Sequence, residues 1–289
     1  DGFVAKFDME TGTIYSLAYG GKTIIADGNG PKLDALRAFT NNDNWFYSQW
    51  FEHGLHNLQH RATNSTVLER NDGTVVLAFT VESQAPNGAK IKGGTSTGKN
   101  SIEELTDRRF GENDFKFTTN QIWTVYPDGS VELQSSITSN RPSLVLPRLG
   151  YVMKIPQQYA DFTYYGRGPI DNYADRKSGQ FIEQHRNTVA GEFVNFPKPQ
   201  DMGKVGDTEV IMPYMKMESA LTYLRNLIFE DAIAFTRKTE YFLDLILASH
   251  PYQLPVAGDT YLHLDAAVTG LGGNSCGQGG PLEQDRVFA

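Results

Sequence analysis

Four glycine-containing turns, each placed between runs of β-branched and aromatic residues, constrain the fold of this chain more than any other feature. A short glycine turn between two such runs reverses the chain and sets two strands side by side. The sequence therefore predicts a mostly antiparallel, all-β structure. The turns are Glu10 to Thr13, Tyr19 to Lys22, Asn71 to Thr74 and Pro127 to Ser130.

The flanking runs carry the residue types that favour strands. They are Phe3 to Phe7, Thr74 to Val81, Gln121 to Tyr126 and Ser130 to Ile137.

Helix signals are few, so we expect one or two short helices, at Trp45 to Gln59 and at Met217 to Leu227. The Gly, Lys, Ser, Thr and Asn-rich stretch Ser83 to Asn113 predicts a long exposed excursion between strands, with a helical turn near Ser101 to Arg108.

The composition and net charge of the chain limit the kinds of molecule that it is expected to bind. With 289 residues and 39% hydrophobic content, residues 1–289 can form a single domain. A net charge of −8 disfavours nucleic acid and anionic membrane surfaces, and it suits a neutral partner such as a sugar. No apolar run reaches the ~20 residues that span a bilayer. A lone Cys276 excludes an internal disulfide, and the start at Asp1 predicts an excised piece of a longer protein.

One run, residues 164–176, concentrates constrained residue types, and we call it the signature segment. We expect a rigid polar loop after a strand, because glycines allow conformations that other residues avoid and proline fixes its own φ. Asx side chains bond neighbouring backbone groups. The constrained residues are Gly166, Gly168, Pro169, Asp171, Asn172, Tyr173, Asp175 and Arg176.

Three histidines, His53, His56 and His60, follow Glu52 at spacings that stack side chains on one helix face. Spacing alone supplies neither ligand geometry nor a second shell. We therefore expect a solvated helix surface here and assign no metal site.

The spacing of titratable residues indicates neither a sugar 1-epimerase nor a retaining glycoside hydrolase. A sugar 1-epimerase needs a histidine and a carboxylate across the ring, but spacing selects no pair among the candidates. Retaining glycoside hydrolysis needs two carboxyl groups about 5 to 5.5 Å apart, usually on a (β/α)₈ barrel, and no strand–helix alternation occurs here. We therefore assign no catalytic residue to this chain. The epimerase candidates are His185, His250 and His263 with Glu183, Asp244 or Asp265.

A glycine-rich run, residues 270–281, lies near the C-terminus, and we call it the closing loop. It lacks the Lys-Ser/Thr ending of a phosphate-binding P-loop, and no helix pattern follows it. A flexible or ligand-facing loop of a β-sandwich fits better.

The signature segment closely resembles the Gly-Pro-x-(Glu/Asp)-Asn-Tyr-x-Asp-Arg motif of the C-terminal β-sandwich domain of glycoside hydrolase family 2 β-galactosidases. Other stretches resemble the same family in the same order. They are Phe7 to Ile14, Arg37 to Asn44, Trp50 to Leu58, Phe196 to Gly203 and Leu264 to Cys276.

This resemblance implies a galactose-mutarotase-like supersandwich that packs against a catalytic barrel of the same polypeptide. The parent hydrolyses terminal β-D-galactosides by a retaining mechanism, and both catalytic glutamates lie on the barrel. The chain itself contributes active-site wall and structural support rather than catalysis, and it holds no cofactor. Magnesium or sodium in the parent is left open, as is the choice among periplasmic, secreted and cytoplasmic sites.

Cys276 stands where the family has a tryptophan that provides an aromatic platform for the sugar. The stacking role does not transfer to it. Substrate-loop candidates are Asn274, Ser275, Cys276 and Gln278, and candidates for bracing the barrel interface or their own loop are Arg37, Asn42 and Asp43.

Two further functions stay open, a stand-alone carbohydrate-binding module and an aldose 1-epimerase. The aromatic platform of a binding module would be Trp45, Phe46, Tyr47 and Trp50, although such spacing is more typical of core.

Overall fold

The computed structural model describes residues 2–93, 98–208, 210–216, 221–223, 227–228, 232–236, 242–255, 260–273 and 280–289. At Trp45 and within 210–242 only the backbone is described. The described chain is an all-β sandwich of mostly antiparallel strands with two short α-helices, as the sequence predicts.

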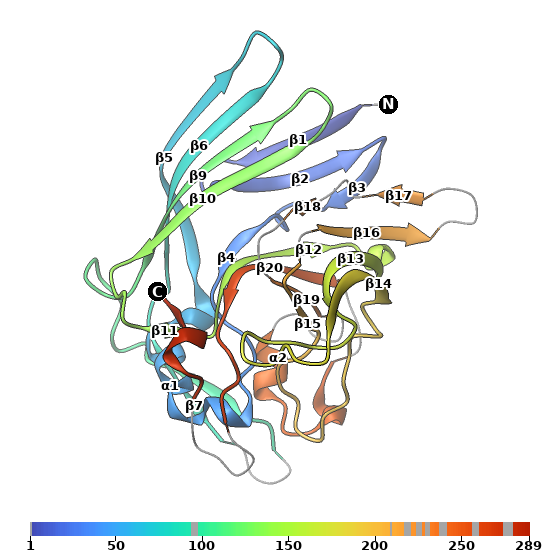
Figure 1. Ribbon diagram of the computed structural model, residues 1–289. Helices are drawn as coiled ribbons and strands as arrows, with labels where there is room; N and C mark the ends of the chain where they lie inside the picture. The colour runs from blue at the N-terminus through green and yellow to red at the C-terminus, as the bar shows by residue number, and fades with distance from the viewer. Residues whose placement is uncertain are drawn as a thin grey trace.

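The strands form several sheets (Figure 1). Three hairpin strands form one sheet: β1 (Phe3–Asp8), β2 (Thr13–Tyr19) and β3 (Lys22–Ile25). A four-stranded sheet has the order β10 (Val131–Ser139), β9 (Phe117–Val125), β6 (Val75–Gln84) and β5 (Gln59–Glu69). A five-stranded sheet has the order β15 (Lys204–Gly206), β19 (Ala232–Thr236), β20 (Thr260–Val268), β12 (Arg148–Ile155) and β4 (Lys32–Asp34).

A further sheet has the order β14 (Phe181–Thr188), β13 (Asp161–Gly168), β16 (Val210–Lys216) and β17 (Leu221–Tyr223), with β18 (Leu227–Ile228) also paired to β16. Two small pairs complete the set: β7 (Ala89–Lys92) with β8 (Ser101–Glu104), and β11 (Val145–Leu146) with β21 (Val287–Phe288). The α-helices are α1 (Tyr47–Glu52) and α2 (Phe242–Leu247).

All four turns predicted from glycine connect antiparallel neighbours. Gly12 shows why the residue type matters, because its φ is +69° and an added Cβ would lie 2.7 Å from Val81 Cγ2. Any other side chain there would be strained in its backbone and would collide with the core. The turns therefore fix the register of these hairpins.

Two apolar cores hold the sheets together. The first lies under the four-stranded sheet, where alternate residues of β6 and β9 face inward, among them Phe79 and Trp123. The second surrounds α1 and includes Trp50 and Phe51, both fully buried. Full burial of one such side chain stabilises the fold by about 1.5–3 kcal/mol. In Figure 1 the long hairpins β5–β6 and β9–β10 extend away from the end of the molecule that carries both helices.

Four local predictions need correction. The described residues of the expected helix at Met217 to Leu227 form strands β17 and β18, so the apolar spacing there reflects sheet pairing. The expected helical turn near Ser101 to Arg108 begins with strand β8, which pairs with β7. The stretch Ser83 to Asn113 is also less exposed than expected, since Ser83, Ala85 and Ala89 are buried. The first predicted helix is shorter than Trp45 to Gln59, because its α-helical part ends at Glu52 and Gly54 adopts φ +74°.

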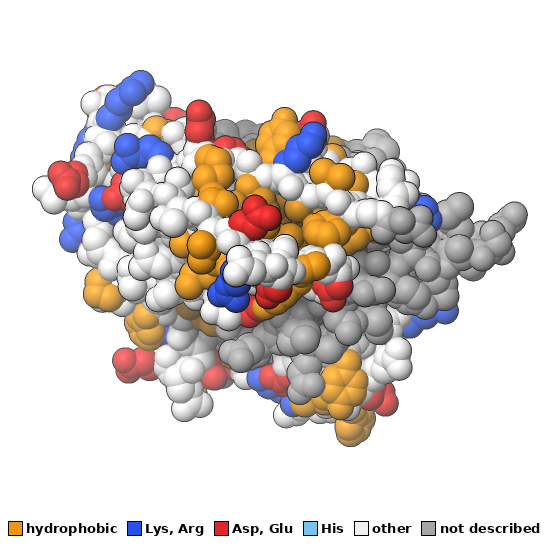
Figure 2. Space-filling view, turned by 90° about the horizontal axis from the view of Figure 1, so that it is seen from above, with side chains coloured by type: hydrophobic (Ala, Val, Ile, Leu, Met, Phe, Trp, Pro, Cys, Tyr) orange, Lys and Arg blue, Asp and Glu red, His pale blue; other side chains and the backbone are white. Residues whose placement is uncertain are grey.

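Figure 2 views the molecule from the side to which the long hairpins extend. Hydrophobic side chains gather near the middle of this face, with acidic and basic side chains among and around them. None of the described helices is long and apolar enough to cross a membrane.

Candidate functional site

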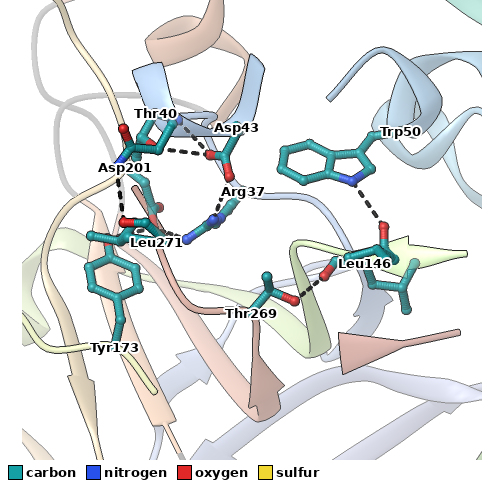
Figure 3. Close-up of polar contacts among 12 residues, drawn as sticks. Arg37, Thr40, Asp43, Trp50, Leu146, Tyr173, Asp201, Thr269 and Leu271 are labelled. Atoms are coloured by element: carbon teal, nitrogen blue, oxygen red, sulfur yellow. Dashed lines mark hydrogen bonds and ion pairs between the residues drawn. The ribbon is translucent and has the colours of Figure 1, made fainter. Parts of the chain in front are cut away.

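The candidate site begins at the loop after β4, where an arginine is completely buried. Arg37 Nη2 lies 2.9 Å from Asp43 Oδ1, and Arg37 Nη1 lies 3.8 Å from Asp201 Oδ2 (Figure 3). Asp43 also accepts hydrogen bonds from the Thr40 backbone N–H (2.7 Å) and hydroxyl (3.1 Å). Burial lowers the pKa of Arg37, but Asp43 and Asp201 outweigh that effect and raise it. The guanidinium therefore stays charged inside the protein.

Asp201 connects this loop to the signature segment. Its Oδ2 accepts a hydrogen bond from Tyr173 Oη (2.8 Å) and lies 3.3 Å from Lys204 Nζ. Arg37 and Lys204 lie 5.6 and 5.2 Å from the centre of the Tyr173 ring, so two cations approach its π system. Burial raises the pKa of Tyr173 well above its usual value and lowers that of Lys204. We call Arg37, Asp43, Asp201 and Lys204 the buried ion network; its two cations and two carboxylates balance.

Asn172 anchors the signature segment to two strands. Its Nδ2 donates to the Arg167 carbonyl (2.9 Å) at the end of β13, and its Oδ1 accepts from the Gly206 N–H (2.8 Å) in β15. Its own backbone N–H donates to the Lys204 carbonyl (2.9 Å). Because both ends of the amide are used, neither aspartate nor leucine can replace it.

The two glycines of this segment serve packing rather than backbone freedom, which corrects the sequence interpretation. Neither Gly166 nor Gly168 has a positive φ. A Cβ on Gly166 would lie 2.6 Å from Thr208 Oγ1, and one on Gly168 would lie 2.1 Å from Tyr164 Oη. The peptide bond between Gly168 and Pro169 is cis.

The other end of the signature segment holds the closing loop. Asp175 accepts hydrogen bonds from the backbone N–H groups of Leu271 (2.9 Å) and Gly272 (2.7 Å). Arg176 Nη2 donates to the Gly272 carbonyl at 2.7 Å. Asn42 Nδ2 donates to the same carbonyl at 3.3 Å. Three segments far apart in the sequence therefore meet at residues 270–273.

A second cluster of buried charges lies on the five-stranded sheet. Arg148 of β12 contacts Asp265 of β20 and lies 3.8 Å from Asp34 of β4, while His263 Nδ1 lies 3.5 Å from Asp34 Oδ2. Burial lowers the pKa of His263 to about 4 and raises that of Asp265 to about 6. The histidine is therefore neutral at physiological pH.

Below the closing loop, Thr269 ties the end of β20 to two other segments (Figure 3). Its hydroxyl donates to the Leu146 carbonyl at 2.5 Å and accepts from the Val287 N–H at 2.8 Å. Nearby, Trp50 Nε1 donates to the Val145 carbonyl at 3.0 Å. The base of the closing loop is thus fixed to the core around α1.

A third group of residues, two carboxylic acids and a tyrosine, lies at or near β13 and has pKa values raised by burial. Burial raises the pKa of Asp171 to about 6 and that of Glu192 to about 7. Glu192 Oε1 accepts a hydrogen bond from Asn187 Nδ2 at 2.5 Å. Tyr164, whose pKa is also raised by burial, is almost fully buried, and its hydroxyl has no hydrogen-bond partner among the described residues.

The site residues predicted from the sequence differ in where the structure places them. Arg37 and Asp43 are wholly buried and pair with each other, while the half-buried Asn42 reaches the closing loop; their bracing of a barrel interface stays a prediction. The substrate-loop candidates Asn274, Ser275, Cys276 and Gln278 lie outside the described residues. The sequence did not identify Asp201 and Lys204 as members of the network, since nothing in residues 196–204 signals buried charge.

The histidine triplet does not share a helix face, because α1 ends at Glu52. His56 is buried against Glu104 (2.8 Å) rather than solvated, and His60 lies in β5 against Ser83 (2.8 Å). Burial lowers the pKa of His60 to about 4. Within the described part of the chain, no three His, Cys, Asp or Glu side chains gather as a metal site.

Of the epimerase candidates, His263 and Asp265 point to one face of β20, but both are buried in the Arg148 cluster. His185 packs on Tyr164 with ring centroids 5.0 Å apart.

The proposed aromatic platform is mostly core. Phe46 and Trp50 are buried, and Tyr47 stacks on Phe39 with centroids 4.6 Å apart. The side chain of Trp45 is not described.

Comparison with known proteins gives one consistent result. The model of a protein family described as "Beta galactosidase small chain" matches residues 1–289. The chain is 25% identical to a β-galactosidase of Halalkalibacterium halodurans over 99% of its own length and 25% of that protein. Similar values hold for β-galactosidases of Kluyveromyces lactis (25% identity, 98% and 25% covered) and Arthrobacter sp. strain B7 (24% identity, 86% and 24% covered). The chain thus spans about a quarter of the length of these relatives.

Proposed function

The chain belongs to the β-galactosidase small-chain family, and we propose that it forms one domain of a β-galactosidase that hydrolyses terminal β-D-galactosides. In this proposal the closing loop contributes to the wall of the active site, and a catalytic barrel domain of the same polypeptide supplies the reacting groups. The observation that carries the proposal is the fixation of residues 270–273 by Asp175, Arg176 and Asn42.

The burial of the carboxyl groups whose pKa values are raised favours a role for this chain in the active-site wall over a catalytic role. An acid and a nucleophile must both reach the anomeric carbon, about 5 to 5.5 Å apart in a retaining enzyme. Of the carboxyl groups whose pKa values are raised, Asp265 and Glu192 are 2% and 5% exposed, and Asp171 is half-buried. Groups as enclosed as Asp265 and Glu192 stabilise or position the fold, and we place the catalytic glutamates on the barrel.

A closing loop that is fixed in advance would be useful in an active-site wall. A loop that touches substrate contributes most when its geometry is set before binding, because ordering it on binding would cost free energy. Asn274, Ser275, Cys276 and Gln278 follow directly after the fixed residues, and we propose them as the substrate-facing part. With Cys276 in place of the family tryptophan, the loop contributes polar groups rather than an aromatic platform.

The test is made in the full-length protein with Asp175→Ala. We expect kcat/KM for a nitrophenyl galactoside to fall about tenfold, which corresponds to ~1.4 kcal/mol of lost transition-state stabilisation. The matched control is Asp72→Ala, since Asp72 also accepts a backbone N–H (Thr74, 2.9 Å) but in the β5–β6 turn. If both variants keep full activity while Asp175→Ala loosens the closing loop in hydrogen exchange, the loop is not part of the active-site wall.

A further inference from the structure

A hollow of about 230 Å³ adjoins the signature segment. It is bounded by the signature segment, the end of β15, the end of β20 and the C-terminal residues 284–287. At ~30 Å³ for each water of the liquid, the hollow equals seven or eight waters, and a hexose ring takes up a comparable volume.

Charged groups line this hollow in fixed positions. Lys177 Nζ lies 2.6 Å from Asp207 Oδ1, and Asp207 Oδ2 lies 2.5 Å from Arg167 Nε. Arg286, also in the lining, donates from Nε to the Pro281 carbonyl at 3.0 Å. Because these side chains are already held, their alignment would cost a ligand little free energy.

Two polar side chains of the lining are free to take a ligand. Asp285 and Gln284 make no side-chain hydrogen bond or ion pair with the described residues, although both line the hollow. A carboxylate accepts hydrogen bonds only, whereas an amide both donates and accepts. Ala267 and Val268 add an apolar patch at the end of β20.

This lining matches a neutral polyhydroxyl ligand better than an ion. Lys177 and Arg167 share Asp207, Lys204 is paired with Asp201, and Arg286 and Asp285 carry opposite charges, so little unpaired charge of either sign faces the hollow. Sugar hydroxyls both donate and accept, and the C–H face of a sugar ring suits an apolar patch. We propose that the hollow binds a monosaccharide at a site separate from the closing loop.

Occupation of the hollow has a mechanical consequence for the closing loop. The Asp285 carbonyl accepts the Gly270 N–H at 2.7 Å, and Asn172, Tyr173 and Ala174, just before Asp175, line the same hollow. A sugar that bridges residues 284–286 and Lys177 therefore ties together the two segments from which the closing loop is held. The inference does not depend on the proposed function, because it rests on the lining alone.

Hydrogen exchange in the full-length protein tests the proposal, with D-galactose, D-glucose and inorganic phosphate as separate probes. We expect at least one of the sugars to slow exchange in peptides covering 172–177 and 284–287. The expected factor is about tenfold at ten times its Kd. The double variant Lys177→Met/Asp285→Asn should lose this protection. The control Lys92→Met removes a cation that is more exposed than Lys177 (61% against 41%) and is paired with Glu103 at 2.8 Å on the β7–β8 hairpin; this variant should keep the protection.

Three outcomes would overturn the proposal. Exchange that no sugar slows in the millimolar range means that the hollow holds only water. Protection by phosphate without protection by sugar means an anion site. Protection that persists in the double variant places the sugar elsewhere. The variants replace partly exposed side chains, so a folding failure would show as faster exchange throughout the domain rather than in these two peptides.

Discussion

Asp201→Asn tests whether the buried ion network fixes the signature segment. In the folded protein Asp201 is fully buried and lies 3.3 Å from Lys204 Nζ and 3.8 Å from Arg37 Nη1. The substitution keeps the shape of the side chain but leaves two buried cations with Asp43 alone, and Asp43 lies against Arg37. Removal of one partner of a buried pair typically costs ~3–5 kcal/mol, because the remaining charge stays desolvated. We expect a loss of this size, with Lys204 as the stranded charge.

The assay is native-state hydrogen exchange on peptides covering 171–176 and 201–206, which reports the local free energy of opening within the full-length protein. Lys204→Met should recover most of the loss in the double variant, since removing both charges removes the desolvation penalty. Glu103→Gln, which breaks a pair exposed on both sides, should cost no more than ~1 kcal/mol. A change below ~1 kcal/mol for Asp201→Asn, or losses that simply add in the double variant, would refute the reasoning.

Two further predictions concern β13 and the carboxyls beside it. Gly168→Ala should destabilise the protein by ~1–3 kcal/mol through overpacking against Tyr164 Oη, and Tyr164→Phe should rescue it and be neutral or stabilising alone, as thermal unfolding would show. The pKa of Glu192 in the folded protein is about 7, above its usual 4.5, so the folded state binds more protons than the unfolded state between these values. The free energy of unfolding should therefore fall as the pH rises from 4.5 to 7. Glu192→Gln should remove most of that decline, which is ~3 kcal/mol at most, and a pH series of unfolding free energies measures it.

The antiparallel organisation was predictable from sequence because hairpins are local. A glycine turn such as Gly12 or Gly129 sets strand neighbours within a few residues, and each predicted strand lies where its turn requires. The same locality explains the errors. Met217 to Leu227 has helical spacing of apolar residues, but its described parts are strands because β16 offers a pairing edge that the segment itself does not encode.

The candidate site was predictable only as a set of unusual residues. The motif identified Asn172, Asp175 and Arg176, but not what each one holds, since their partners lie in the β15 and closing-loop segments. Buried charge is also invisible in sequence, because Lys204 looks like any surface lysine until the fold encloses it. The packing role of Gly168 depends on Tyr164, whose direction is set by tertiary contacts.

Burying these charges costs free energy, and we infer that the chain keeps them because they fix the positions of its loops rather than because they stabilise the core. Well-packed apolar residues of similar volume often stabilise a core as much as a buried ion pair does. An ion network differs in that it satisfies its partners in one arrangement only, so it excludes shifted packings of the loops it joins. Arg37 and Asp201 join the loop after β4 to the signature segment, and Asp175 extends that fixed frame to residues 270–273. A loop held from two sides, by this charged frame and by the Asp285 carbonyl at Gly270, suits the active-site wall that we propose.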